Sequence, residues 1–453
     1  MARRPRSRRT RQASSSWPDL PSELLGVVLL RLSFADRACL AKVCRTWSSG
    51  ARLQPLPAPP PWLILRNGTF LDLADNAVHR MPVPNDARCR GSADNWLVVM
   101  SERSHRWYLM NPFSGATLPL PELTAFWRRA YASLMVRFGS GGWFNVHNVY
   151  VKKVAVSWED AGSPRRKNPV LAAVIHDKLK DSRGFKVVVC RPGAGLCPSS
   201  SIESKRGADD DQLRDIQDIT FFKGKLYAVS HDGELIAIKL RREGRRAGRP
   251  VISGVERVAH GPDLGPDPTP YPNLGCTLKP LYLVPSGDRL LMVSRWTDWR
   301  RSPIFDDCSH WTFKFEVFEA EFGGAGGSFC RWEKVDSLRG RALYVGTHGS
   351  GSVPATRSPA AGGVREDRIY YMHQDACSSQ PENPLADSGV YDMRDGSCSK
   401  LGVDEEDLDS FYGPDAARGW GHGYWFPTWL FPAGTTCGDD RDDRASSKRA
   451  HRI

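Results

Sequence analysis

The sequence predicts a mainly β protein, in which a small N-terminal helical unit is followed by a six- or seven-bladed β-propeller. Three features of the sequence predict this fold. Short apolar runs separated by glycine turns recur through residues 62–432, as they do in chains of strand hairpins. A proline-rich stretch at 55–61 precedes these runs and is expected to act as a stiff spacer. Before the prolines, residues 20–32 are almost uniformly apolar, which favours a helix covered on more than one side.

The helix predicted within residues 20–32 is more apolar than a small surface unit requires. Between Glu23 and Ser33, only Gly26 and Arg31 are not apolar, whereas a surface helix normally shows one apolar stripe. Roughly forty residues are available to fold around it, and a unit that small buries a modest fraction of its surface. We therefore expect one face to pack internally and the other to be covered by another protein. The alternative is a helical hairpin that docks onto the rest of the same chain.

Local signals also predict a compact helical unit. Pro21 suits the first turn of a helix, where its missing N–H costs nothing. Residues 33–36 resemble a capping box that ends in Asp36. Gly50 is a candidate helix stop. Between them, four residues have the spacing of a single helix face: Leu40, Val43, Cys44 and Trp47.

The region from residue 62 onward is predicted to be a closed ring of strand hairpins. Three dipeptides have the composition of hairpin turns, namely Lys223-Gly224, Asp232-Gly233 and Asp395-Gly396. A strand, a turn and a strand with an aromatic residue recur loosely, which favours a β-propeller. Because ring closure removes exposed sheet edges, residues 425–432 are predicted to pair with residues 62–65. The alternative is a pair of β-sandwiches.

The net charge of +12 lies mostly in two short runs. The arginines within residues 3–11 contribute six positive charges and residues 241–249 contribute a net four, so the rest of the chain is close to neutral. Runs of this kind are usually solvated tails or loops. We expect weak, nonspecific phosphate binding and no specific nucleic-acid partner. The first run is also a candidate nuclear-import signal.

Cysteine usage and hydropathy predict a nuclear and/or cytoplasmic protein with no membrane partner. The eleven cysteines are scattered without a Cys-x-x-Cys pair, which argues for reduced thiols. No apolar run approaches the ~18–20 residues that span a bilayer. The basic N-terminus is followed by polar residues, whereas a secretory signal would continue with an apolar core.

No motif predicts catalysis, a metal or a cofactor. The sequence contains no nucleophile elbow, phosphate-binding loop, zinc-protease motif or dinucleotide fingerprint. The carboxylate clusters at 209–211, 405–407 and 439–440 lie among polar residues and are expected to be solvated loops. Cys308-x-His310 resembles half of a metal site, but nothing completes it. We therefore expect a protein that is not an enzyme and that needs no cofactor.

The N-terminal unit resembles an F-box. The similar residues are Leu20-Pro21-x-Glu23-Leu24, then Val28, Arg31-Leu32, Asp36, Val43-Cys44-Arg45 and Trp47. The resemblance implies binding to a small Skp-type adaptor, and through it to a cullin, as part of a ubiquitin ligase. It also implies the adaptor-facing residues, with the last two partly in the core: Leu20, Pro21, Leu24, Leu25, Val28, Leu32, Val43 and Trp47.

The region after the prolines is similar to a plant class of F-box proteins with a C-terminal propeller-like domain of unknown function. The matching motifs are Asn111-Pro-Phe-Ser-Gly115, Gly224–Val229, Ile369-Tyr-Tyr371 and Trp425-Phe-Pro427. Kelch repeats would place a Gly-Gly pair before each aromatic residue, and Gly-Gly does not recur regularly. The resemblance implies a β domain that binds a target protein.

These observations predict the order of the domains. A disordered basic tail covers residues 1–15, and the helical F-box covers 16–54. The proline-rich linker at 55–61 joins it to the propeller-like domain at 62–432. A disordered tail follows at 433–453.

The predicted function is that of a non-catalytic, target-binding subunit of a Skp–cullin–F-box ubiquitin ligase. The alternatives are a propeller scaffold with a degenerate F-box, and a propeller enzyme. Trp and Arg are enriched in binding hot spots, so we expect the target to contact the segment 294–301, through Trp296, Trp299, Arg300 and Arg301. The alternative for this segment is an aromatic-rich strand followed by a solvated turn. The sequence does not identify the target protein.

Overall fold

We describe a computed structural model of the 453-residue chain. Its secondary structure is mainly β, with two short helices near the N-terminus. The chain divides into two compact units, one spanning Pro60–Pro432 and the other containing the helices. The predicted tails 1–15 and 433–453 and most of the linker lie outside the residues that the structure describes. The described residues are 20–32, 36–37, 40, 43–53, 60–64, 68–73, 77–81, 83–84, 87–101, 104, 106–123, 149–158, 169–177, 185–193, 200–203, 216–243, 248–263, 276–301, 308–323, 330–356, 364–372, 385, 387–401 and 427–432.

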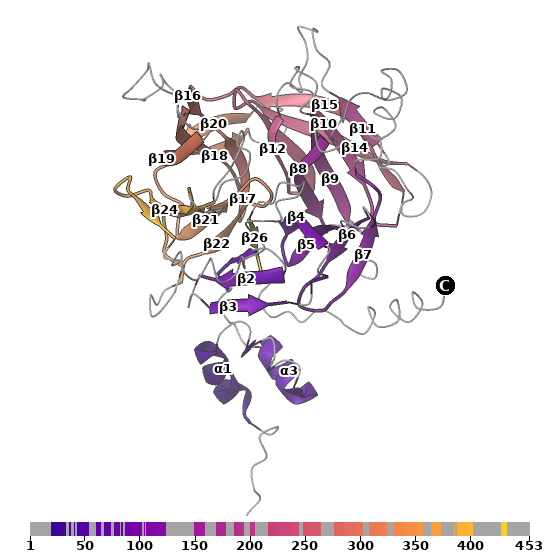
Figure 1. Ribbon diagram of the computed structural model, residues 1–453, viewed down its shortest axis with the longest axis vertical. Helices are drawn as coiled ribbons and strands as arrows, with labels where there is room; N and C mark the ends of the chain where they lie inside the picture. The colour runs from indigo at the N-terminus through magenta and orange to yellow at the C-terminus, as the bar shows by residue number, and fades with distance from the viewer. Residues whose placement is uncertain are drawn as a thin grey trace, which may run out of the picture. The chain divides into compact units, whose positions relative to one another are not determined.

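The larger unit is a six-bladed β-propeller, which confirms the predicted fold and selects the lower of the two predicted blade numbers (Figure 1). Within the described residues, each blade is a sheet of four or five strands, and the sheets follow one another around a ring. The alternative of two β-sandwiches is therefore wrong. The ring arrangement leaves each blade face covered by the next blade, which is how a long all-β chain protects its sheets.

The first three blades use the N-terminal strands together with the last strand of the chain. Blade 1 has the order β26 (Thr428–Leu430), β1 (Trp62–Ile64), β2 (Thr69–Asp72) and β3 (Ala77–Arg80). Blade 2 contains β4 (Ala87–Ala93), β5 (Trp96–Ser101), β6 (Trp107–Met110) and β7 (Thr117–Leu120). Blade 3 contains β8 (Val149–Ser157), β9 (Val170–Asp177), β10 (Phe185–Cys190) and β11 (Ser200–Glu203).

The other three blades follow in chain order. Blade 4 contains β12 (Ile216–Phe222), β13 (Lys225–Ser230), β14 (Leu235–Glu243) and β15 (Arg249–Ala259). Blade 5 contains β16 (Cys276–Leu278), β17 (Leu281–Ser286), β18 (Arg289–Arg301), β19 (Cys308–Phe322) and β20 (Cys330–Lys334). Blade 6 contains β21 (Arg341–Val345), β22 (Gly351–Pro354), β23 (Arg368–Tyr371), β24 (Gly389–Asp392) and β25 (Cys398–Lys400), and β21 pairs with β23 in parallel.

The hairpin turns form where the sequence predicts them. Lys223 and Gly224 join β12 to β13, and both have positive φ angles of 46° and 74°. Two consecutive positive φ angles match the right-handed twist of the flanking strands. The predicted Asp232-Gly233 and Asp395-Gly396 turns join β13 to β14 and β24 to β25.

The ring closes by pairing the two ends of the propeller. Strand β26 pairs antiparallel with β1, with Trp62 opposite Leu430 and Ile64 opposite Thr428. This confirms the predicted pairing within 425–432 and 62–65, although Trp425 and Phe426 lie outside the described residues. Trp429 is fully buried, and its indole Nε1 donates a hydrogen bond to the Val345 carbonyl of blade 6 at 3.1 Å.

Apolar residues fill the spaces between successive blades. Separate buried clusters join blades 2 and 3, 3 and 4, 4 and 5, 5 and 6, and 6 and 1. Blades 1 and 2 are joined by a backbone hydrogen bond, in which the Phe431 amide donates to the Asp94 carbonyl at 3.1 Å. The Ser92 amide also donates to the His348 carbonyl of blade 6 at 3.3 Å. The closing joint therefore depends on main-chain geometry.

A buried ionic pair connects blades 3, 4 and 5. The Lys153 Nζ of β8 lies 3.0 Å from the Asp218 carboxylate of β12, and both side chains are buried. The same carboxylate accepts a hydrogen bond of 2.9 Å from the Leu283 amide of β17. Asp218 thus joins blades 3, 4 and 5.

Replacing Trp429 with Ala is expected to destabilise the propeller by about 3–5 kcal/mol, because it leaves a cavity and breaks the hydrogen bond to blade 6. Trp429→Phe keeps an aromatic ring and should cost less. Urea unfolding of the full chain measures both losses. If the two variants were as stable as the wild type, the closing strand would not stabilise the ring.

Replacing Asp218 with Leu is expected to cost about 3–5 kcal/mol, because Lys153 would remain buried without its partner charge. The double variant Lys153→Met/Asp218→Leu leaves no unpaired charge, so it should be more stable than the single variant. Urea unfolding of both variants tests this order. A double variant less stable than the single one would contradict it.

An exposed apolar helix face as the candidate functional site

The helical unit has a small core built by α1 (Ser22–Arg31) and α3 (Arg45–Leu53). The first intrahelical hydrogen bond of α1 runs from the Leu25 amide to the Pro21 carbonyl at 3.0 Å, as expected for a proline next to the first turn. Leu25 and Leu29 point inward and pack with Leu40 and Ala51. One face of α1 therefore packs internally, as predicted.

Gly50 lies inside α3 and does not end the helix, so its predicted role as a stop is wrong. A Cβ atom at this position would lie 2.7 Å from Leu25 Cδ2. Glycine is therefore needed for close approach of α3 to α1.

The side chain of Arg37 caps the C-terminus of α1, a role that the sequence analysis missed. Its Nε donates to the carbonyl oxygens of Leu29 at 2.7 Å and Leu32 at 3.0 Å. These carbonyls lie at the C-terminal end of α1, where few intrahelical donors remain and positive charge is favourable. Burial lowers the pKa of Arg37. A basic residue shortly after a predicted helix end is the signal that could have found it.

The continuous helix face predicted from Leu40 to Trp47 is interrupted. Cys44 lies outside both flanking helical stretches. Its Sγ accepts a hydrogen bond from the Trp47 amide at 3.4 Å, and its carbonyl accepts one from the Ser48 amide at 3.0 Å. Cys44 therefore occupies the N-cap position of α3, and the residues on its two sides do not share one helix face. The capping box predicted at 33–36 lies largely outside the described residues.

The helical unit exposes a set of large apolar side chains, which we call the apolar face. Its members and their exposed fractions are Leu24 at 54%, Val27 at 49%, Val28 at 38%, Leu30 at 56% and Val43 at 68%. Four of them lie on α1, on the side away from Leu25 and Leu29. Burying such side chains fully is worth about 1.5–3 kcal/mol each, so this surface favours contact with another protein.

The residues predicted to face an adaptor divide into three groups. Leu24, Val28 and Val43 lie on the apolar face, and Pro21 is exposed beside it. Leu20, Leu32 and Trp47 are partly buried against the core. Leu25 is only 2% exposed and lies inside the core, so it packs within the helical unit and is not part of the apolar face. Val27 and Leu30 belong to the apolar face but were not among the predicted residues.

The segment predicted to contact a target lies on the long strand β18 of blade 5. This strand and β19 extend beyond the other strands of the blade, and β16 pairs with the extension at Thr297–Trp299. Trp296 is 1% exposed, so its ring is internal. The side chains of Trp299, Arg300 and Arg301 lie outside what the structure describes, and target binding by this segment remains a prediction.

Trp296 is held by a charged cluster on blade 5. Its Nε1 donates to Glu316 Oε2 at 3.2 Å, and Lys279 Nζ lies 3.9 Å from the centre of its ring. Although burial opposes the change, hydrogen bonds from Lys334 and Lys314 lower the pKa of Glu316. These contacts account for a buried tryptophan within a charged sequence.

Other kinds of site are not evident in the described part of the chain. No group of three or more metal-binding side chains gathers among those residues. None of the helices described there is long and apolar enough to cross a membrane.

Comparison with known proteins identifies both units. The sequence model of the F-box domain matches residues 17–57, so this is an F-box protein of the substrate-receptor type, as its apolar helix face suggests. A model described as the KIB1-4 beta-propeller matches residues 70–392, which is more than half of the chain. The chain therefore belongs to the KIB1-4 β-propeller family.

The similar curated proteins come from a plant, which confirms the resemblance seen in the sequence. "F-box protein At1g10110" of Arabidopsis thaliana is 24% identical over 80% of this chain and 86% of its own length. "F-box/kelch-repeat protein At1g57790" of the same plant is 31% identical over 24% of this chain and 34% of its own length. The first relative is similar over most of both chains, and the second is similar over about a quarter of this chain.

The two sides of α1 should respond differently to substitution. Leu29→Ala should open the helical unit, since it removes a fully buried side chain worth about 2–5 kcal/mol. Leu24→Asp should leave it folded, because that side chain is already exposed. Amide hydrogen exchange of residues 22–31 in the full chain measures both effects. Equally fast exchange in the two variants would contradict the assignment of inner and outer faces.

Proposed function

We propose that this protein is the target-binding subunit of a Skp–cullin–F-box ubiquitin ligase. The observation that carries the proposal is the apolar face, which would cost free energy if it stayed in water. A Skp-type adaptor that covers Leu24, Val28 and Val43 would remove this cost and connect the chain to a cullin. The propeller would hold the target protein.

In this mechanism the protein contributes proximity and carries out no reaction of its own. A target held by the propeller would meet the ubiquitin-loaded enzyme at a high effective concentration. The prolines at 55–61 would limit the separations that the two units can adopt. The segment 294–301 is the proposed contact for the target, through the residues of the β18 extension.

The proposed location is the nucleus and/or the cytoplasm. It is supported by the arginines within residues 3–11, which have the composition of an import signal. Five described cysteines are free thiols, consistent with a reducing compartment.

The double variant Leu24→Asp/Val28→Asp is expected to weaken binding to a Skp-type adaptor by roughly a hundredfold or more, because two apolar contacts are lost and two charges must be desolvated. Calorimetry with the purified full chain and adaptor measures the affinity. Trp311→Asp, which places one such charge on an exposed apolar residue of the propeller, is the control and should bind as the wild type does.

The same experiment separates the receptor from a scaffold with a degenerate F-box. Tight wild-type binding that only the double variant loses supports the receptor. Absence of binding by a wild-type chain whose helical unit is folded, judged by amide hydrogen exchange, would overturn the proposal.

A further inference from the structure

Arg289, the first residue of β18, is a buried cation that is only partly satisfied. Its Nη2 donates to Glu319 Oε2 at 2.7 Å, and the residue is 8% exposed. Its Nε and Nη1 are buried without a hydrogen-bond acceptor in the described part of the chain. Ser286, the residue opposite Arg289 in β17, has a buried Oγ that also lacks a hydrogen-bond partner in the described part of the chain. Buried donors of this kind are unfavourable unless something accepts from them.

Arg341 of β21 reaches the same corner from blade 6. Its Nε and Nη2 donate to Ser352 Oγ at 3.0 and 2.9 Å, and that hydroxyl lies 3.2 Å from the Pro285 carbonyl, next to Ser286. Burial, and then the charge of Arg289, lower the pKa of Arg341. Through Ser352, Arg341 thus reaches the backbone beside Ser286, the residue opposite Arg289.

Arg339 completes the cluster from the surface. Its Nη2 lies 3.2 Å from Glu319 Oε2, the same oxygen that pairs with Arg289, and its side chain is 66% exposed. Glu319 is thus the one carboxylate paired with two of the three arginines. The formal charge of the three arginines and Glu319 is +2.

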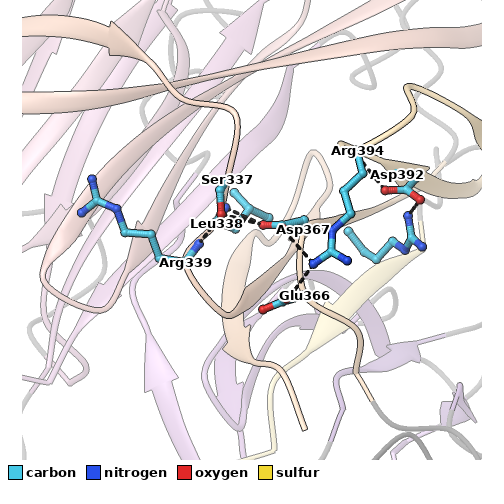
Figure 2. A network of polar contacts seen from close by, with 8 residues as sticks. Ser337, Leu338, Arg339, Glu366, Asp367, Asp392 and Arg394 are labelled. Carbon is cyan, nitrogen blue, oxygen red and sulfur yellow. Dashed lines mark hydrogen bonds and ion pairs between the residues drawn. The ribbon is translucent and has the colours of Figure 1, made fainter. Parts of the chain in front are cut away.

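The turn that carries Arg339 is held in place by the polar network of Figure 2. Asp367 Oδ1 accepts hydrogen bonds from the Leu338 amide at 2.7 Å and the Ser337 hydroxyl at 3.1 Å. Ser337 Oγ in turn accepts the Arg339 amide at 3.1 Å, and Arg394 donates to Asp367 Oδ2 at 3.2 Å. Arg339 itself has a φ of 53°, a conformation that costs energy outside glycine and is retained where surrounding contacts enforce it.

We propose that Arg289, Arg339 and Arg341 form an anion-binding site between blades 5 and 6 that takes the phosphate group of a ligand. The free N–H donors of Arg289 and the hydroxyl of Ser286 would meet phosphate oxygens. A phosphate monoester carries close to two negative charges and several acceptor oxygens, which matches a cluster of charge +2. A single carboxylate would be served by one arginine fork. Arg339, whose side chain is 66% exposed, is the member of the cluster that a ligand would meet first.

The phosphate can come from a small molecule or from a phosphorylated side chain of a protein. The site is independent of the apolar face and does not rest on adaptor binding. Calorimetry with the full chain uses sodium phosphate, with sodium chloride at the same ionic strength as reference. A second titration uses a short peptide with a central phosphoserine, with the unphosphorylated peptide as reference.

Arg289→Gln and Arg341→Gln are each expected to weaken phosphate binding by about tenfold or more, since each removes a charged hydrogen-bond donor. Arg339→Gln should weaken phosphate binding less, by about threefold, because the Arg339 side chain is exposed and solvent weakens its ionic contacts. Arg331→Gln is the matched control: Arg331 is an exposed arginine paired with Glu321 on the same strand as Glu319, and its loss should leave binding unchanged.

The two titrations distinguish the sources of the phosphate. Binding of inorganic phosphate alone supports a small-molecule ligand, and binding of the phosphopeptide supports a phosphorylated protein. Absence of both, or binding that Arg289→Gln, Arg341→Gln and Arg339→Gln leave unchanged, would overturn the proposal. Because Arg339 is exposed, its variant tests the site even if a substitution of buried Arg289 unfolds blade 5.

Discussion

The pairing of β26 with β1 is the constraint on which the propeller depends. A six-bladed ring made from one chain has to join its first and last blades, and here three residues at each end form that joint. Without it, blade 1 would present an open sheet edge and the indole of Trp429 would lose its buried position against Tyr344 and Val345. Every other blade is completed by neighbours in sequence, so this long-range strand pairing, supported by the contacts of blade 6 with blades 1 and 2, converts a row of sheets into a closed structure.

The two units differ in how much of their apolar surface they bury. The propeller covers its sheet faces with the apolar clusters between blades and uses ionic groups such as Asp218 to connect neighbouring blades. The helical unit has too few residues to do this. It buries Leu25 and Leu29 and leaves Leu24, Val28 and their neighbours exposed. The small unit therefore leaves an apolar surface that the proposed adaptor would cover, whereas the propeller covers its own sheet faces.

Most features that depend on residues close together in the sequence were predicted, whereas most features that depend on residues far apart were not. The Lys223-Gly224 turn was predictable because two positive φ angles are a local demand of a tight hairpin. The F-box pattern was recognisable because its residues lie within one short segment. The sequence analysis missed the interruption of the helix at Cys44, because a thiol and a carbonyl that cap a helix leave the spacing of the apolar residues unchanged. Trp296 looked like a surface residue among arginines, but Glu316 and Lys279, which are distant in sequence or on other strands, enclose it.

By itself, the sequence determined the class of the protein, the β character of the long domain, its closing strand and the excess apolar surface of residues 20–32. These properties depend on composition, on spacing and on turn residues, all of which act over short distances along the chain. Only the tertiary structure decided the number of blades, the division of α1 into Leu25 and Leu29 inside and Leu24 and Val28 outside, and the meeting of Arg289, Arg339 and Arg341. Arg339 and Arg341 lie two residues apart at the start of blade 6, whereas Arg289 begins β18, so only the packing of blade 6 against blade 5 brings the charge of Arg289 to theirs.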